Sequence, residues 1–212
     1  MTQRWIEIDK GDKRGRVLAD RHYTRGSVGH PMWTRPGWNQ CLYLEQQSGR
    51  AAVFCWWRPK WESGLPGTER KDGLRCIECA IFRNETRFRS SDLIRDAVAC
   101  LLTWEHAQDQ AWPDGIITGV NVAKTAGGRQ PGSAPGKCFL EAGFEVFHHP
   151  GKNKRADLWL RYTDPLPRAV APPLSVRLAE KRRIIEAPVP VVANRISMAR
   201  TRAHGRRLTG KA

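Results

Sequence analysis

A histidine and a tyrosine stand side by side at positions 22 and 23, at the expected end of a short helix. An imidazole titrates near neutral pH and can take a proton from an attacking amine, while a phenol can donate a proton or ligate a metal. His22 and Tyr23 are therefore candidates for a proton relay or for metal ligands. The alternative is that the pair only packs beneath the tryptophan-rich loop that follows, and from these residues alone packing is the more common outcome.

Asn121 is a second candidate, because it directly follows the apolar run of residues 115–120. An amide at a strand end can orient an acceptor or a donor carbonyl by hydrogen bonding. Asparagine is also an ordinary turn residue, so both roles stay open. Cys138 is a conceivable nucleophile, but its only basic sequence neighbour is Lys137 and most buried thiols are inert.

A basic loop, residues 83–89, joins an expected strand to an expected helix. The free N–H groups at a helix start attract anions, and arginines add charge and hydrogen-bond donors. We therefore expect this junction to bind the phosphates of a cofactor, through Arg83, Arg87, Arg89, Ser90 and Ser91. The alternative is that the arginines are solvated and that Ser90 or Ser91 merely caps the helix.

The stretch from residue 74 to 107 must position these groups. Its first part alternates, which predicts a strand with Ile77, Cys79 and Ile81 on one face and Phe82 on the other. Its second part recurs at helical spacing and predicts a helix that ends near residues 108–113. The apolar stripe of that helix comprises Leu93, Ile94, Ala97, Val98, Leu101 and Leu102.

The remaining pattern predicts a mixed α/β domain with one dominant sheet, arranged as α/β/α layers whose strands splay around the central helix. The expected strands are residues 3–8, 41–44, 51–57, 115–120, 144–148 and 157–162, and the expected short helices are residues 17–22 and 137–142. This domain covers residues 1–162, and residues 163–212 read as a proline-rich linker followed by a basic, flexible tail.

The formal net charge is +15 and the sequence pI is about 10.2, which suggests a polyanionic partner, most simply double-stranded DNA. From residue 167 onward the chain carries 11 lysines and arginines against two glutamates, and so +9 of the +15. Tryptophans in loops can stack on bases, although core packing is their more common fate. The nucleic-acid candidates are Trp33, Trp38, Lys124, Arg129, Arg182 and Arg183.

No run of about 18 apolar residues predicts a membrane span, and the first residues lack the apolar segment of a secretory signal. We therefore expect a cytoplasmic protein, in the host cell if a phage encodes it, with its six cysteines reduced.

The order of elements and the run KCFLEAGF at residues 137–144 resemble the GNAT acyltransferase fold. Residues 87–92, RFRSSD, stand where that fold has its pyrophosphate loop, with serine and aspartate in place of small residues. A narrower resemblance, over roughly residues 15–162, is to phage Mom-like DNA modification proteins, a divergent GNAT branch. It is carried by DRHYTR at 20–25, IFRNE at 81–85, SSDLI at 90–94, PGKCF at 135–139 and AGF at 142–144.

The Mom-like resemblance implies an enzyme that transfers an acyl-derived group to the exocyclic amine of adenine in DNA and so protects the DNA from restriction. It implies His22 and Tyr23 as catalytic residues, with Asn121, our third catalytic candidate, at the place where relatives carry an acidic residue. The resemblance further implies an acyl donor, either acetyl-CoA or another activated acyl group. It also implies an iron ion held by His22 and Tyr23. Two alternatives stay open: an acetyltransferase for a protein or small molecule, and a non-catalytic basic DNA-binding protein.

Overall fold

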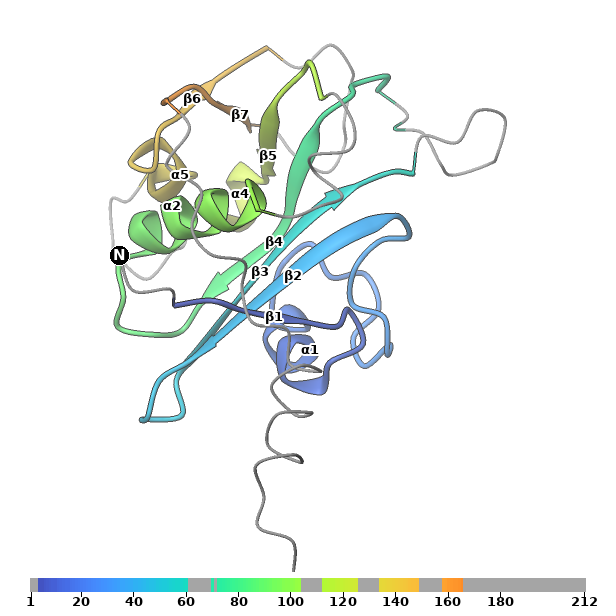
Figure 1. Ribbon diagram of the computed structural model, residues 1–212, viewed down its shortest axis with the longest axis vertical. Coiled ribbons are helices and arrows are strands. Elements are labelled where there is room, and N and C mark those ends of the chain that lie inside the picture. Colours follow the sequence, from blue (N-terminus) through green and yellow to red (C-terminus); the bar gives the residue numbers. More distant parts are fainter. Residues whose placement is uncertain are drawn as a thin grey trace, which may run out of the picture.

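The computed structural model describes residues 4–60, 70, 72–103, 112–125, 134–148 and 158–165. Its centre is one seven-stranded mixed sheet of order β1-β2-β3-β4-β5-β7-β6 (Figure 1). The elements are β1 (Ile6–Ile8), α1 (Lys13–Ala19), β2 (Trp38–Glu45), β3 (Ala51–Arg58), β4 (Ile77–Asn84), α2 (Ser90–Leu101), β5 (Ile116–Val120), α4 (Val122–Thr125), α5 (Lys137–Leu140), β6 (Phe144–Val146) and β7 (Leu158–Tyr162). The prediction of a mixed α/β domain with one dominant sheet is confirmed.

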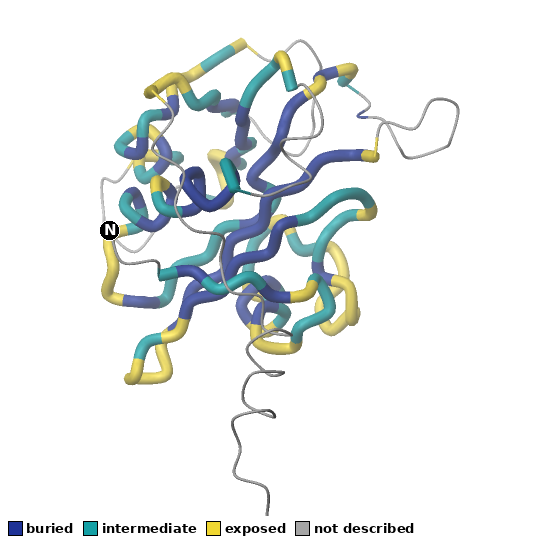
Figure 2. Tube along the Cα trace, in the orientation of Figure 1, coloured by how far each residue is buried: buried dark blue, intermediate teal, exposed yellow. Residues whose placement is uncertain are grey.

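Two apolar clusters lie on opposite faces of the sheet. On one face α2 and α5 pack over the strands, burying residues such as Phe54, Ile94 and Phe139. On the other face α1 covers the β2–β4 half through Leu18 and Ala19, with Trp33 beneath it. The tube in Figure 2 shows the central strands buried between these layers.

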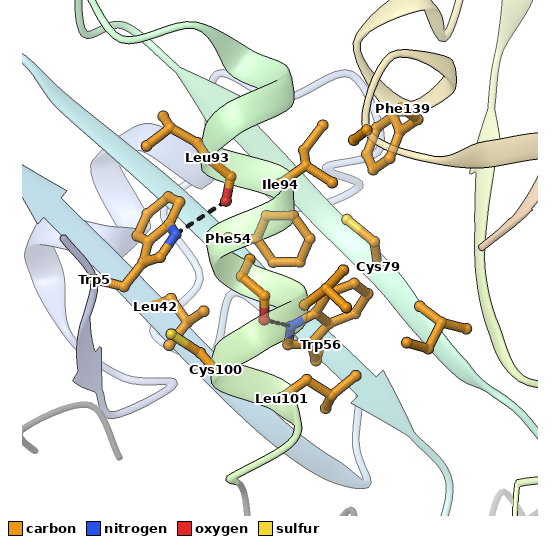
Figure 3. Close-up of a cluster of buried hydrophobic side chains, with 14 of the residues drawn as sticks. Trp5, Leu42, Phe54, Trp56, Cys79, Leu93, Ile94, Cys100, Leu101 and Phe139 are labelled. Atoms are coloured by element: carbon orange, nitrogen blue, oxygen red, sulfur yellow. Dashed lines mark hydrogen bonds between the residues drawn. The ribbon is translucent and has the colours of Figure 1, made fainter. Parts of the chain in front are cut away.

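Two tryptophans fix the position of α2 on its face of the sheet. The indole N–H of Trp5 donates to the Leu93 carbonyl at 3.1 Å, and that of Trp56 donates to the Ala97 carbonyl at 2.9 Å (Figure 3). The two carbonyls lie one helical turn apart, so the indoles set both the rotation and the height of the helix. The predicted apolar stripe is buried along α2, with Leu102 at its C-cap.

A bulge in β4 changes which side chains face α2. Cys55 pairs with Ile81 and Trp56 pairs with Cys79, so Ala80 has no partner on β3. One extra residue reverses the alternation beyond it. Ile77 and Cys79 share a face as predicted, and this face lies against α2. Phe82 also packs there and Ile81 lies on the α1 face, so strict alternation was wrong past Cys79.

The helix ends also differ from expectation. The first helix begins at Lys13 rather than Val17, because the Asp12 carboxylate accepts the Arg14 backbone N–H at 2.8 Å and caps it. The end of the central helix near residues 108–113 falls partly outside the described residues, since 104–111 are not described. Within the part of the chain that is described, no helix has the length and apolar content to cross a bilayer.

Gly15 provides a test of the packing between α1 and the sheet. A Cβ at this position would lie 2.6 Å from Ile8 Cδ1 and 2.9 Å from Trp33 Cζ2. Alanine raises helix propensity by about 1 kcal/mol, yet we expect Gly15→Ala to lower the free energy of unfolding by ~1–3 kcal/mol because of the clash. Val17→Ala, on the exposed side of the same helix, should be neutral or slightly stabilising. Urea unfolding compares the two, and a stabilised Gly15→Ala protein would contradict the packing.

Candidate active site at the divergence of β4 and β5

The parallel strands β4 and β5 pair only briefly. Their register contains Ile77 with Ile116, Glu78 with Ile117 and Cys79 with Thr118. Beyond these pairs β4 continues to Asn84 and β5 continues to Val120 without pairing to each other. The end of β5 therefore presents backbone groups on the side that β4 has left, and Figure 1 shows β4 running on past the end of β5.

The hydroxyl of Tyr23 occupies that side of β5. It donates to the Gly119 carbonyl and accepts the Asn121 backbone N–H, each at 3.5 Å. Groups two residues apart in an extended chain point to the same edge, which is how one phenol reaches both. Both hydrogen bonds are long, so a substrate group can replace them at small cost. The structure thus brings together Tyr23 and Asn121, as the sequence predicted.

The surroundings of Tyr23 keep its hydroxyl protonated. Burial raises the pKa of the phenol, the Asn121 N–H acts in the opposite direction, and the thiols of Cys79 and Cys138 raise it further. Cys138 lies in α5 on the face covered by α2, whereas Tyr23 follows α1, which covers the opposite face. The Tyr23 phenol therefore approaches the divergence of β4 and β5 from the α1 face of the sheet, while α5 borders that divergence on the α2 face.

His22 stacks beside Tyr23, with 4.4 Å between ring centroids. Its Nδ1 lies 2.7 Å from the Thr24 hydroxyl and accepts the Thr24 backbone N–H at 3.3 Å. A backbone N–H can only donate, so Nδ1 is the acceptor and the ring proton lies on Nε2. Burial, together with the charge of Arg83, lowers the pKa of His22 to about 4. At neutral pH His22 is therefore an uncharged donor through Nε2.

Arg83 belongs with His22 rather than with the predicted phosphate site. Its guanidinium donates to the Glu85 carboxylate at 2.7 Å and to the Arg21 carbonyl at 2.6 Å. The Arg21 guanidinium also pairs with the Glu85 carboxylate at 3.2 Å, so Arg21, Arg83 and Glu85 form one network. The network ties the end of β4 to the backbone that carries His22, so Arg83 positions the histidine.

Asn121 contributes its backbone rather than its side chain to Tyr23. Its Oδ1 accepts the Lys124 N–H at 2.8 Å and so begins α4. The turn role that asparagine often plays is therefore the one its amide oxygen has here. The exposed Lys124 side chain remains a candidate for phosphate contact.

The N-terminus of α2 is uncapped by any side chain. Its N-cap is Arg89, without a capping hydrogen bond, so the predicted serine cap is wrong. The Ser90 hydroxyl instead accepts the Asn84 amide at 3.0 Å, and the Ser91 hydroxyl is buried without a hydrogen-bond partner. Open first-turn N–H groups beside exposed Arg87 suit a phosphate group. Arg89 is exposed and pairs with Glu141 at 3.2 Å.

The predicted base-stacking tryptophans differ in exposure. Trp33 is 2% exposed and packs in the α1 cluster, so it is a core residue and offers no stacking surface. Trp38 is half-buried, with the guanidinium of Arg58 at 5.7 Å and the ammonium of Lys60 at 5.8 Å from its ring centre. Arg129, Arg182 and Arg183 lie outside the described residues.

The arrangement around His22 does not fit a resident iron ion. A metal bound at Nε2 would require the proton to move to Nδ1, which Thr24 already occupies as a donor. Within the ranges that the structure covers, no three His, Cys, Asp or Glu side chains gather to hold a metal. Iron ligation by His22 and Tyr23 stays a prediction.

Sequence reasoning missed Thr24 and gave Cys138 a different role. A threonine two residues after a histidine is a short-range pattern that can be read from sequence. The neighbourhood of Cys138 and Tyr23 is a tertiary contact with no local signal. Burial raises the pKa of Cys138 to about 11, so this thiol is not an activated nucleophile.

The lowered pKa of His22 predicts a loss of stability in acid. The imidazole titrates at 6.5 in the unfolded chain and at about 4 in the folded one, so protonation favours unfolding. The stabilisation is complete above pH 6.5 and is lost as the pH falls toward 4. As the pH falls from 6.5 to 4, we expect the free energy of unfolding to decrease by ~1–3 kcal/mol more in the wild type than in His22→Gln. Urea unfolding measures this, and equal losses would contradict a buried neutral imidazole.

No protein-family model, no curated protein and no solved structure matches this chain.

Proposed function

We propose that this chain is a GNAT-like, Mom-like enzyme that transfers an acyl-derived group to the exocyclic amine of adenine in double-stranded DNA, which protects that DNA from restriction. The observation that carries the proposal is the Tyr23 hydroxyl at the divergence of β4 and β5. It is a protonated group, held by two long hydrogen bonds, between elements from both faces of the sheet.

Tyr23 supplies the proton transfer that acyl transfer to an amine needs. The amine nitrogen attacks the acyl carbonyl carbon, and the bond from that carbon to its leaving group breaks. Tyr23 gives its hydroxyl proton to the leaving group and takes the proton lost by the amine, so the phenol is regenerated. Its raised pKa favours this role, because the hydroxyl begins protonated and the transient phenolate is a strong base.

His22 acts as a neutral hydrogen-bond donor in this proposal. With Nδ1 engaged by Thr24, its Nε2–H is the group available for the oxygen of the acyl carbonyl. A fixed donor stabilises the charge that develops there more than it stabilises the ground state. Arg83 keeps the histidine in place through the Arg21 carbonyl and helps to keep it uncharged.

The start of α2 is the proposed site for the phosphates of the donor. Its open N–H groups and the exposed Arg87 side chain offer donors and positive charge. β4 leads directly into this junction, so a long donor can place its phosphates there and its acyl group beside Tyr23. The formal charge of +15 favours DNA as the acceptor.

Nucleoside mass spectrometry of co-expressed DNA tests the function. We expect a modified adenosine with the wild type and a decrease of about 10²-fold or more with Tyr23→Phe, which removes only the hydroxyl. Tyr162→Phe is the matched control, because that hydroxyl contacts the Pro165 carbonyl away from the site, and it should leave the product unchanged.

Only unmodified nucleosides from the wild type, with auxiliary phage genes supplied, would overturn the proposed function. Turnover of acetyl-CoA on a protein or small amine without DNA would favour the acetyltransferase alternative. Salt-sensitive DNA binding without any product would favour a non-catalytic protein.

A further inference from the structure

A tight turn projects an apolar side chain from the segment between α1 and β2. The His30 N–H donates to the Ser27 carbonyl at 3.4 Å, and Gly29 has a φ of 81°, which a glycine adopts without strain. Val28 lies at the apex and is 74% exposed, the largest value among the exposed large apolar residues described. Figure 2 shows exposed chain in this region beside α1.

The turn is anchored by one partly buried ion pair. The Asp20 carboxylate accepts the Gly29 N–H at 2.9 Å and the Arg25 Nε–H at 2.6 Å. The Arg25 side chain is only 8% exposed and also donates to the carbonyls of His30 at 2.9 Å and Met32 at 3.3 Å. Because these contacts fix the backbone on both sides of Val28, its apex is held in one orientation.

The same anchor places the turn next to the candidate active site. Asp20 is two residues before His22, and Arg25 is two residues after Tyr23. The ion pair therefore closes a short loop that contains the two proposed catalytic residues and carries the turn at its edge. Val28 follows Tyr23 by five residues, so the turn and the candidate active site belong to one anchored segment.

The charge around the turn matches a polyanion. Residues 10–37 contain seven lysines and arginines but only two acidic residues. Asp12 and Asp20 are paired with Arg14 and Arg25, and Arg21 is paired with Glu85 at the end of β4, which leaves an exposed positive side chain at Lys13. The described residues between α1 and β2 expose two large apolar side chains, Val28 and Met32. They are too few for the broad apolar patch that marks a protein-binding surface, whereas an apolar apex in a basic surface suits a nucleic acid.

We propose that the Ser27–His30 turn inserts Val28 between the bases of duplex DNA and fills the place of the adenine that enters the active site. The inference rests on the proposed function, because the adenine amine is paired in a duplex and must be extruded to react. Apolar side chains that wedge between base steps stabilise such unstacked DNA. Valine suits this role because its branched side chain is stiff.

Duplexes that carry one 2-aminopurine in each nearest-neighbour context test the wedge, since this base fluoresces when it leaves the stack. We expect the wild type to raise the fluorescence in at least one context. Val28→Ala should reduce that signal and the yield of modified adenosine by about tenfold, because the shorter side chain supports the unstacked step less well. Val28→Ile should keep both.

Val146→Ala is the matched control, since Val146 is another exposed valine, on β6, and its loss should change neither readout. A duplex with an abasic site opposite the target adenine needs no wedge, so on this substrate Val28→Ala should match the wild type. This rescue separates a wedge from a damaged fold.

The outcomes separate the wedge from the proposed function. Undiminished fluorescence and product with Val28→Ala would overturn the wedge and leave the function standing. A Val28-dependent signal without modified adenosine would keep the wedge and overturn the function. No fluorescence change with the wild type in any context would also overturn the wedge.

Discussion

Where β4 turns away, β5 stays paired with β7 on one edge but has no strand partner on the other, and the rest of the site depends on how the backbone of that free edge is satisfied. A buried carbonyl or N–H without a partner is costly. The Tyr23 hydroxyl meets both needs at Gly119 and Asn121. Because these bonds are long, the same contact that completes the fold can be exchanged for a contact with a reacting molecule. The Tyr23 hydroxyl thus has both a structural role and the proposed chemical role.

The segment that carries Tyr23 is held at its two ends. Near its start, Arg83 and Glu85 at the end of β4 bind the backbone and side chain of Arg21. Near its end, Arg35 lies 3.7 Å from the centre of the Trp57 ring and pairs with Glu78 at 2.6 Å, at the beginning of β4. The segment is therefore clamped to both ends of one strand.

That second clamp continues into the interior. Glu78 also pairs with Arg70, whose side chain is 5% exposed and which binds Asp72 in turn. The Trp57 indole donates to the Pro36 carbonyl at 2.7 Å. An arginine this deeply buried needs its carboxylates, since an unpaired buried charge is strongly destabilising. The segment from Asp20 to Gly37 is thus positioned by polar contacts, despite its lack of regular structure.

Local pattern was sufficient to predict most of the fold but little of the site. Periodicity located the strands and the stripe of α2, because burial on one face imposes it. The bulge at Ala80 could not be read, since a single unpaired residue leaves no mark in composition, and it moved Ile81 and Phe82 to the opposite faces. The Trp33 ring was ambiguous for a similar reason, because only tertiary packing decides whether a loop tryptophan is covered.

The site residues divide in the same way. The adjacency of His22 and Tyr23 is visible in the sequence, whereas the contact of Tyr23 with Gly119 and Asn121, about 100 positions later, depends on the divergence of two strands. The serines at the start of α2 matched a capping pattern, yet the helix begins at Ser90 itself, whose hydroxyl accepts the Asn84 amide, and the N-cap Arg89 makes no capping hydrogen bond. Sequence propensity predicts the most common role of a residue type. The role that a residue has in the fold depends on which distant groups compete for its hydrogen-bonding atoms.

The most direct test of the central claim is a crystal structure with a bound CoA thioester. The account predicts the thioester between the diverging ends of β4 and β5, the Tyr23 hydroxyl turned from Gly119 to the bound group, and the diphosphate at the start of α2. A well-ordered thioester bound elsewhere, with Tyr23 still contacting Gly119 and Asn121, would contradict it.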